Sequence, residues 1–208
     1  MIRLIAVVAA CLFCSAAWSA GFVDLRYAGG SYEFNDEDSD DKLEIEDVDG
    51  FEGRVHLDVS QAIFLRGSYL DASGDEVEAN DIEVDADVES RIGRLGGGYQ
   101  FAAKPFLVGF SVEYVDLKIE IEDEAFSDDG GMITAGLRDH GTRKLFWYAE
   151  VGTVLMQDMS GAEVDAAIGY RFTPQVAAFF GTQAYHLEDD DDVEVDVVHV
   201  ALGVRFTF

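Results

Sequence analysis

The sequence predicts an all-β protein built as an up-and-down antiparallel barrel of ten strands. Residues alternate with period two along most of the chain, as a strand with two unlike faces requires. Short connections alternate with long ones. One face of the alternation is large and apolar, whereas the other carries Gly, Ala and Ser with single charges. Because small residues suit a crowded lumen and lipid requires an apolar exterior, the sequence predicts a transmembrane barrel.

The first twenty residues predict a secretory signal peptide. Arg3 precedes the apolar run LIAVVAACLF, and the small-residue segment CSAAWSA follows it. Cleavage is expected after Ser19 or Ala20, which leaves 21–208 as the barrel domain. Both cysteines, Cys11 and Cys14, lie in the signal, so we expect no disulfide or thiol chemistry in the mature chain.

The N-terminal half contains five of the ten predicted strands. The first loses its alternation at Gly29-Gly30, which predicts a bulge. The second alternates from Phe51 to Val59, and the fifth alternates from Phe106 to Tyr114. The five predicted ranges are 22–34, 50–60, 62–71, 88–101 and 105–118.

The C-terminal half supplies the other five strands. The eighth alternates from Val164 to Phe172, and the tenth ends the chain on Phe208. No apolar run after the signal approaches the roughly 20 residues of a spanning helix, so strands are the expected spanning elements. The predicted ranges are 131–139, 144–156, 163–173, 175–186 and 194–208. Eight strands is the alternative count.

The connections between these strands differ in length and charge. Short turns are expected at Ser60-Gln61, at 102–104, at DHGTRK and around Pro174. The five long connections hold 35 of the 42 acidic residues. They are 35–49, 71–89, 116–130, 157–165 and 187–196. In an up-and-down barrel all long connections fall at one end, so we expect acidic extracellular loops, short periplasmic turns and periplasmic termini.

The last strand resembles the C-terminus of the small outer-membrane β-barrel proteins of Gram-negative bacteria. Those proteins end in an aromatic residue with apolar residues alternating before it, and the barrel-assembly machinery reads this signal. The matching positions are Val200, Leu202, Val204, Phe206 and Phe208. The alternation in DIEVDADV and VEVDVV is also similar to the OmpX/Ail type, whose eight strands project beyond the membrane. The resemblance implies a location in the outer membrane.

The lumen face carries single charges of both signs. An enclosed charge must be paired or hydrated, so these residues predict an Arg–carboxylate network that fills a narrow barrel. The alternative is a narrow pore in which charged rings set ion preference. The predicted lumen charges are Asp24, Arg26, Glu52, Arg54, Asp58, Arg66, Arg94, Glu113, Arg138, Glu150, Arg171 and Arg205.

The acidic connections offer hard oxygen ligands for Ca²⁺ or Mg²⁺. The candidate ligands are Asp36, Asp38, Asp40, Asp189, Asp190, Asp191 and Asp192. The alternative is a solvated face that repels neighbouring molecules. No other cofactor is expected.

Charge and composition narrow the function. A net charge of −28 argues against nucleic acid as a partner. The four histidines, His56, His140, His186 and His199, form no catalytic signature, so we expect no enzyme. The sequence predicts a monomer in contact with outer-membrane lipid and lipopolysaccharide, with a role in envelope structure, surface interaction or adhesion. The alternative function is a narrow porin-like channel.

Overall fold

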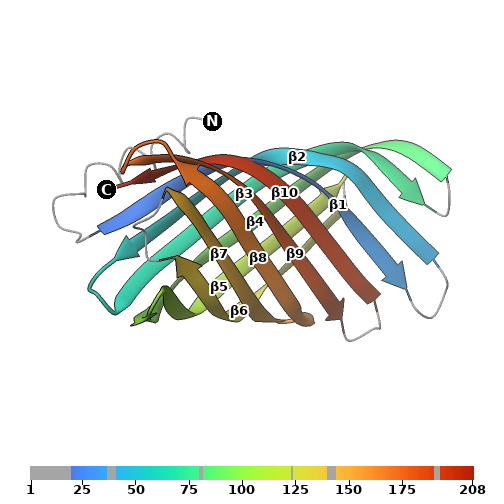
Figure 1. The fold of residues 1–208 in the computed structure, drawn as a ribbon. Coiled ribbons are helices and arrows are strands. Elements are labelled where there is room, and N and C mark those ends of the chain that lie inside the picture. The colour runs from blue at the N-terminus through green and yellow to red at the C-terminus, as the bar shows by residue number, and fades with distance from the viewer. Residues whose placement is uncertain (1–19, 37–40, 80–81, 123, 140–143, 190–192) are drawn as a thin grey trace.

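The computed structural model describes residues 20–36, 41–79, 82–122, 124–139, 144–189 and 193–208. Over these residues the chain forms a closed barrel of ten antiparallel strands in sequence order, with β1 beside β10 (Figure 1). The predicted all-β class, the up-and-down topology and ten strands are therefore confirmed. Apart from Ala20, the predicted signal peptide lies outside the described residues. In the described part of the chain, no helix is long and apolar enough to cross a membrane.

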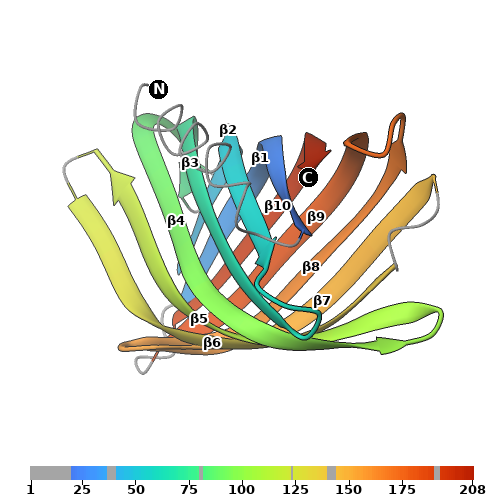
Figure 2. The ribbon, with the colours of Figure 1, turned by 90° about the vertical axis from the view of Figure 1, so that its left-hand side faces the viewer.

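The strands differ widely in length, and β4 is the longest. Figure 2 shows β4 bending strongly along its course. The strand bounds are β1 Ala20–Asp36, β2 Asp41–Asp58, β3 Ile63–Ala79, β4 Ile82–Ala103, β5 Phe106–Ile121, β6 Glu124–Asp139, β7 Leu145–Met156, β8 Met159–Arg171, β9 Val176–Asp189 and β10 Val193–Thr207.

The barrel closes where its first and last strands meet. β1 and β10 pair from Phe22 opposite Thr207 to Asp36 opposite Val193. Gly21 and Phe208 then exchange two backbone hydrogen bonds of 3.1 Å. The predicted bulge is confirmed, because the β1–β2 register shifts between Gly30 and Tyr32. Closure pairs both edge strands, which would otherwise be open to another chain.

The strands extend well into the segments that the sequence predicts as long loops. β2 begins at Asp41 instead of 50, and β4 begins at Ile82 instead of 88. The expectation of long loops is therefore wrong for most of these acidic residues. The reason lies in their alternation: Ile45 is fully buried inside the barrel while its neighbour Glu46 is exposed. Segments with such unlike faces gain from pairing as strands.

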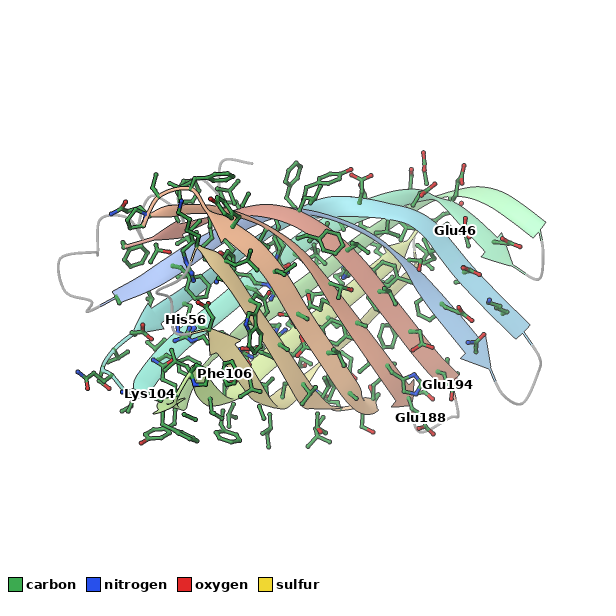
Figure 3. The ribbon with its side chains drawn as sticks, viewed as in Figure 1. Glu46, His56, Lys104, Phe106, Glu188 and Glu194 are labelled. Atoms are coloured by element: carbon green, nitrogen blue, oxygen red, sulfur yellow. The ribbon has the colours of Figure 1, made fainter. Side chains whose placement is uncertain are left out.

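The two ends of the barrel are unlike. The short-turn end contains Lys104 and Phe106, and the acidic end contains Glu46, Glu188 and Glu194 (Figure 3). At the acidic end the wall is uneven: in Figure 1 the strands β1 to β4 reach farthest to the right, whereas β7 and β8 turn back sooner.

The chemistry of the two wall faces reverses along the barrel. Around the middle the outer face is apolar, as Leu95 and Leu202 show with 70% and 66% exposure, and the inner face is polar. Toward the acidic end the outer face becomes acidic and the inner face becomes apolar. The buried residues there form a cluster that we call the apolar plug. They are Ala28, Tyr32, Ile45, Val48, Leu70, Ala72, Val77, Val88, Ile92, Val115, Leu117, Ile119, Met132, Val154, Met159, Tyr185, Leu187, Val195, Val197 and Ala201.

Candidate functional site

An ion-pair network fills the lumen between the plug and the short-turn end. At the seam, the Arg205 guanidinium donates two hydrogen bonds of 2.7 Å to the carboxylate of Asp24. It also lies over the ring of Phe22, 3.8 Å from the ring centroid. A bidentate pair stacked on an aromatic ring fixes a guanidinium in one orientation.

The central part of the network links four strands. Arg26 pairs with Glu52 at 2.9 Å, and Arg54 joins the same carboxylate to Asp165. Arg54 also donates a hydrogen bond of 2.8 Å to the side-chain oxygen of Gln183. Each buried carboxylate here has a cationic partner, which buried charges need to be tolerated.

Three further arginines line the wall on the side of β3 to β8. Arg94 pairs with Glu163 and, at 3.3 Å, with Glu113. Arg66 joins Glu113 to Glu150, and Arg171 pairs with Asp139 at 3.2 Å.

Arg138 differs from the other lumen arginines. It donates a hydrogen bond to Gln100, and its contact with the carboxylate of Asp58 is long, at 3.6 Å. Its side chain also lies 3.1 Å from the imidazole nitrogen Nε2 of His56. The His56 ring in turn stacks between Phe22 and Phe64.

The structure places all twelve sequence-predicted lumen charges inside the barrel, and each of those other than Arg171 contacts another of the twelve. The network members that sequence reasoning missed include Gln100, Asp139, Glu163, Asp165 and Gln183. Glu163 and Asp165 fall where the predicted connection 157–165 overlaps the predicted strand 163–173, and they lie on the same inward face as Ala167. The alternation of that strand would have placed both on the lumen face.

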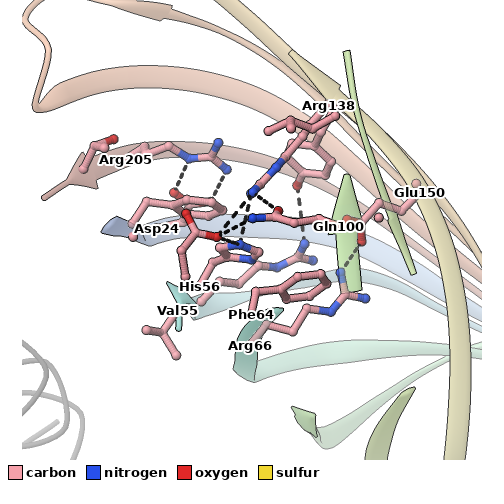
Figure 4. Close-up of a pocket in the computed structure, with 18 of the residues that line it drawn as sticks. Asp24, Val55, His56, Phe64, Arg66, Gln100, Arg138, Glu150 and Arg205 are labelled. Atoms are coloured by element: carbon pink, nitrogen blue, oxygen red, sulfur yellow. Dashed lines mark hydrogen bonds and ion pairs between the residues drawn. The ribbon is translucent and has the colours of Figure 1, made fainter. Parts of the chain in front are cut away.

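A cavity of about 340 Å³ lies inside the network. Ala20, Gly21, Pro174 and Thr207 belong to its lining, so it reaches the short-turn end. Figure 4 shows charged side chains of both signs around it, with Arg138 and Glu150 among them. Toward the acidic end, the central ion pairs and the plug close the lumen.

A small hydrogen-bonded cluster joins the network to the plug. The hydroxyl of Tyr32 donates to Ser90 Oγ at 2.7 Å and lies 3.0 Å from Nε2 of His199. All three residues are buried. His199 is therefore part of the lumen filling.

The outer wall at the acidic end carries carboxylates opposite one another on neighbouring strands. Glu33 lies opposite Glu44, and Glu44 lies opposite Glu78. Glu46 lies opposite Glu76 in the next row. Like charges in directly opposed positions destabilise a sheet. Lys42 reduces this repulsion, because it contacts Glu33 at 3.0 Å and Glu44 at 3.1 Å.

Of the seven cation-ligand candidates, the structure describes only one side chain. Asp189 accepts a hydrogen bond of 3.0 Å from the backbone N–H of Val193. Asp38, Asp40, Asp190, Asp191 and Asp192 lie outside the described residues, as does the side chain of Asp36. Where residues are described, no group of three or more His, Cys, Asp or Glu is placed to hold a metal ion.

The five residues matched to the assembly signal lie at the end of the chain. Val200, Leu202, Val204 and Phe206 point outward from β10 and are 38–66% exposed. Phe208 follows them at the seam, opposite Gly21. This outward apolar row is suited to lipid, and its role in assembly stays a prediction.

A closed antiparallel barrel with an apolar outer band and a polar, ion-paired lumen defines a transmembrane β-barrel protein. Residues 5–206 match the family described as the outer membrane protein beta-barrel domain, so this chain belongs to that family. Membership places the chain in the outer membrane of Gram-negative bacteria. Comparison with curated proteins gives no significant match.

Solved structures with similar folds come from several bacteria. The beta domain of the Bordetella autotransporter BrkA has a TM-score of 0.51 and 11% identity, and the match covers 90% of this chain and 99% of that chain. Neisserial surface protein A has a TM-score of 0.44 and 13% identity, over 91% and 99% of the two chains. Ail of Yersinia pestis has a TM-score of 0.43 and 11% identity, over 91% and 98%. At these identities the similarity concerns the fold alone.

Proposed function

We propose that this protein is a filled, non-catalytic outer-membrane barrel that works through its acidic end, which faces the outside of the cell. The observation that carries the proposal is the reversal of the two wall faces. Beyond the apolar band the strands continue as a paired wall, with the apolar plug inside and carboxylates outside. Such a wall holds the carboxylates in fixed positions, which flexible loops would not do.

The opposed carboxylates indicate what the acidic end binds. The rows through Glu44 and Glu46 cost folding free energy unless cations reduce their repulsion. Screening by monovalent salt lowers that cost only partly, because the rows lie well within a Debye length of about 8 Å. Divalent cations or basic groups of a partner can bridge neighbouring carboxylates. We therefore propose a role in surface interaction or adhesion, with Ca²⁺ or Mg²⁺ joining the wall to lipopolysaccharide phosphates.

The alternative function is a narrow channel for small solutes or ions. The cavity at the short-turn end favours the channel function, but the apolar plug in the lumen argues against it. Leu187 and Val197 belong to a contiguous apolar cluster that occupies the lumen, and ions do not cross a dry apolar constriction readily. Ten strands also lie near the barrel size that side chains fill, far below the sixteen of aqueous porins.

Two measurements on the refolded protein test these functions. A fluorescent decalysine peptide should bind the protein in liposomes, and Glu44→Gln/Glu46→Gln/Glu76→Gln should weaken binding severalfold. A matched control, Glu113→Gln, removes a lumen carboxylate and should leave peptide binding unchanged. If the triple variant binds the peptide as strongly as Glu113→Gln does, the carboxylates at the acidic end do not form the proposed binding surface. Stable single-channel steps in a planar bilayer would favour the channel.

The same proposal includes the partners expected from the sequence. Outer-membrane lipid would cover the apolar band, the barrel-assembly machinery would insert the chain, and the mature protein would be a monomer. We include no nucleic-acid partner, because nucleic-acid binding needs a basic patch and the net charge is −28.

A further inference from the structure

The cavity at the short-turn end has the properties of a ligand pocket. Its volume of about 340 Å³ falls in the range of small-molecule sites, roughly 300–1,000 Å³. It is open at the short-turn end and closed toward the acidic end, so a molecule could enter it but could not pass through. Its inward lining includes Phe64, Leu107 and Tyr148 beside the charged residues.

Two charged residues in the lining are more accessible to a ligand than the rest. Arg138 and Glu150 each have 25% exposed side chains, the highest value for their sign among the ion-paired lumen residues. The carboxylate nearest Arg138 is Asp58, at 3.6 Å, and Asp58 also contacts His56 at 3.2 Å. Glu150 shares its partner Arg66 with Glu113. Both groups therefore keep capacity for another partner of opposite charge.

Arg138 and Glu150 lie side by side on one wall of the cavity (Figure 4). In the β6–β7 register, Arg138 is opposite Tyr148 and Gly136 is opposite Glu150. The two charged residues are thus diagonal neighbours on the inner face, at a typical spacing of about 7–8 Å between Cα atoms. They form no ion pair with each other in the described part of the chain. A ligand with adjacent charges of opposite sign can bridge them.

Glycines create the space in front of this pair. Gly136 and Gly109 face the lumen without side chains. A Cβ built on Gly109 would meet only the ring of Phe64, at 3.9 Å. The space beside the charged pair is therefore bordered by an aromatic ring and by Leu107, which suits an apolar substituent.

We propose that this cavity binds a small zwitterion, a free α-amino acid with an apolar side chain. Its carboxylate accepts hydrogen bonds from the guanidinium of Arg138. Its primary ammonium group donates to the carboxylate of Glu150. Its side chain packs against Phe64 and Leu107. The site is separate from the acidic end and needs no passage through the barrel.

The first experiment compares three probes on the refolded wild-type protein by titration calorimetry. L-phenylalanine carries both charges, N-acetyl-L-phenylalanine lacks the ammonium group and L-phenylalaninamide lacks the carboxylate. Saturable binding is expected for L-phenylalanine, and binding at least about tenfold weaker is expected for the other two, because each lacks one of the two charge-assisted contacts. Equal binding of all three, or no saturable binding of L-phenylalanine, would overturn the proposal.

The second experiment uses variants whose folding is checked by heat-modifiable migration. Arg138→Gln and Glu150→Gln should each weaken L-phenylalanine binding about tenfold or more. Gly109→Leu should abolish it by filling the cavity. The matched control is Gly53→Leu, because a Cβ at Gly53 meets nothing within 4 Å and β2 directs this residue outward. Unchanged affinity in Gly109→Leu would contradict the assigned site. If a variant does not fold, the comparison of the three probes on the wild-type protein still tests the proposal.

Discussion

Arg205 and Asp24 stand opposite each other across the barrel seam and are joined by two hydrogen bonds of 2.7 Å, although 181 residues separate them in sequence. The pair is nearly inaccessible to solvent, with side chains 10% and 1% exposed. It therefore links the first strand of the chain to the last in a place that little solvent reaches.

Removing one member of this pair should destabilise the barrel strongly. Asp24→Asn leaves the Arg205 charge buried without a counter-charge, which costs about 3–5 kcal/mol. Urea unfolding in lipid vesicles measures the loss. Arg91→Gln removes the ion pair between Arg91 and Glu89 on the outer surface and should change stability little. Equal unfolding midpoints for the two variants would show that the seam pair does not stabilise closure.

Asp128 should hold the turn between β7 and β8. Its buried carboxylate accepts hydrogen bonds of 3.1–3.2 Å from the backbone N–H groups of Gln157, Asp158 and Met159. Asp128→Ala leaves these donors without that acceptor, at a cost of about 1–3 kcal/mol. Hydrogen exchange of the three amides should accelerate. The control is Asp158→Ala, which removes an exposed side chain from the same turn, and comparable acceleration there would contradict a specific role for Asp128.

The proposed orientation places Glu46 outside the cell and Gln61 in the periplasm. Both residues are exposed, near opposite ends of the barrel. Single cysteines at these positions should respond oppositely to an impermeant thiol reagent on whole cells, with labelling at 46 and none at 61. Permeabilising the outer membrane should make 61 reactive and serves as the control. Labelling at 61 alone on intact cells would show that the barrel has the opposite orientation.

His186 should titrate above the ordinary range for histidine. A hydrogen bond of 2.8 Å to Asp196 on the neighbouring strand raises the pKa of His186. The contact therefore contributes its full stabilisation of the folded state below the unfolded-state pKa of about 6.5. This stabilisation is lost as pH rises through the higher folded-state pKa. NMR titration of the His186 ring reports the midpoint, and Asp196→Asn should lower it. A wild-type midpoint at or below the ordinary value would contradict this prediction.

Calcium should protect the acidic end more than monovalent salt does. Proteolysis within 35–49, 71–89 and 187–196 should slow in millimolar Ca²⁺ relative to NaCl of equal ionic strength, because a divalent ion can bridge carboxylates. Neutralising Asp189 to Asp192 should reduce the protection, whereas Asp158→Asn should not. Equal protection by NaCl would show that the acidic end is only a solvated surface and does not bind Ca²⁺.

The sequence predicted the strands, their faces and the lumen charges because period-two alternation is local and survives in each segment. It failed at the acidic segments because charge density was taken as a sign of loop structure. EIEDVDG interleaves acidic and apolar residues, and an irregularity at Asp47, where φ is 53°, lets both Ile45 and Val48 point inward although they are three residues apart. The pairing of Arg54 with Asp165, 111 residues away, could not be predicted from the sequence, because it depends on tilt and shear across the closed barrel.

The reversal of the wall faces also sets how deeply the barrel sits in the bilayer. On β10 the outward residues change from Asp196 to Val198 within a single step of the alternation. Movement inward would carry Asp196 and its counterparts into hydrocarbon, and movement outward would expose the apolar band to water. Both displacements raise the free energy, because a charged side chain on the lipid-facing surface is destabilising to a degree that grows with its depth in the hydrocarbon. The level at which the outer face changes from acidic to apolar therefore sets the vertical position of the barrel in the membrane.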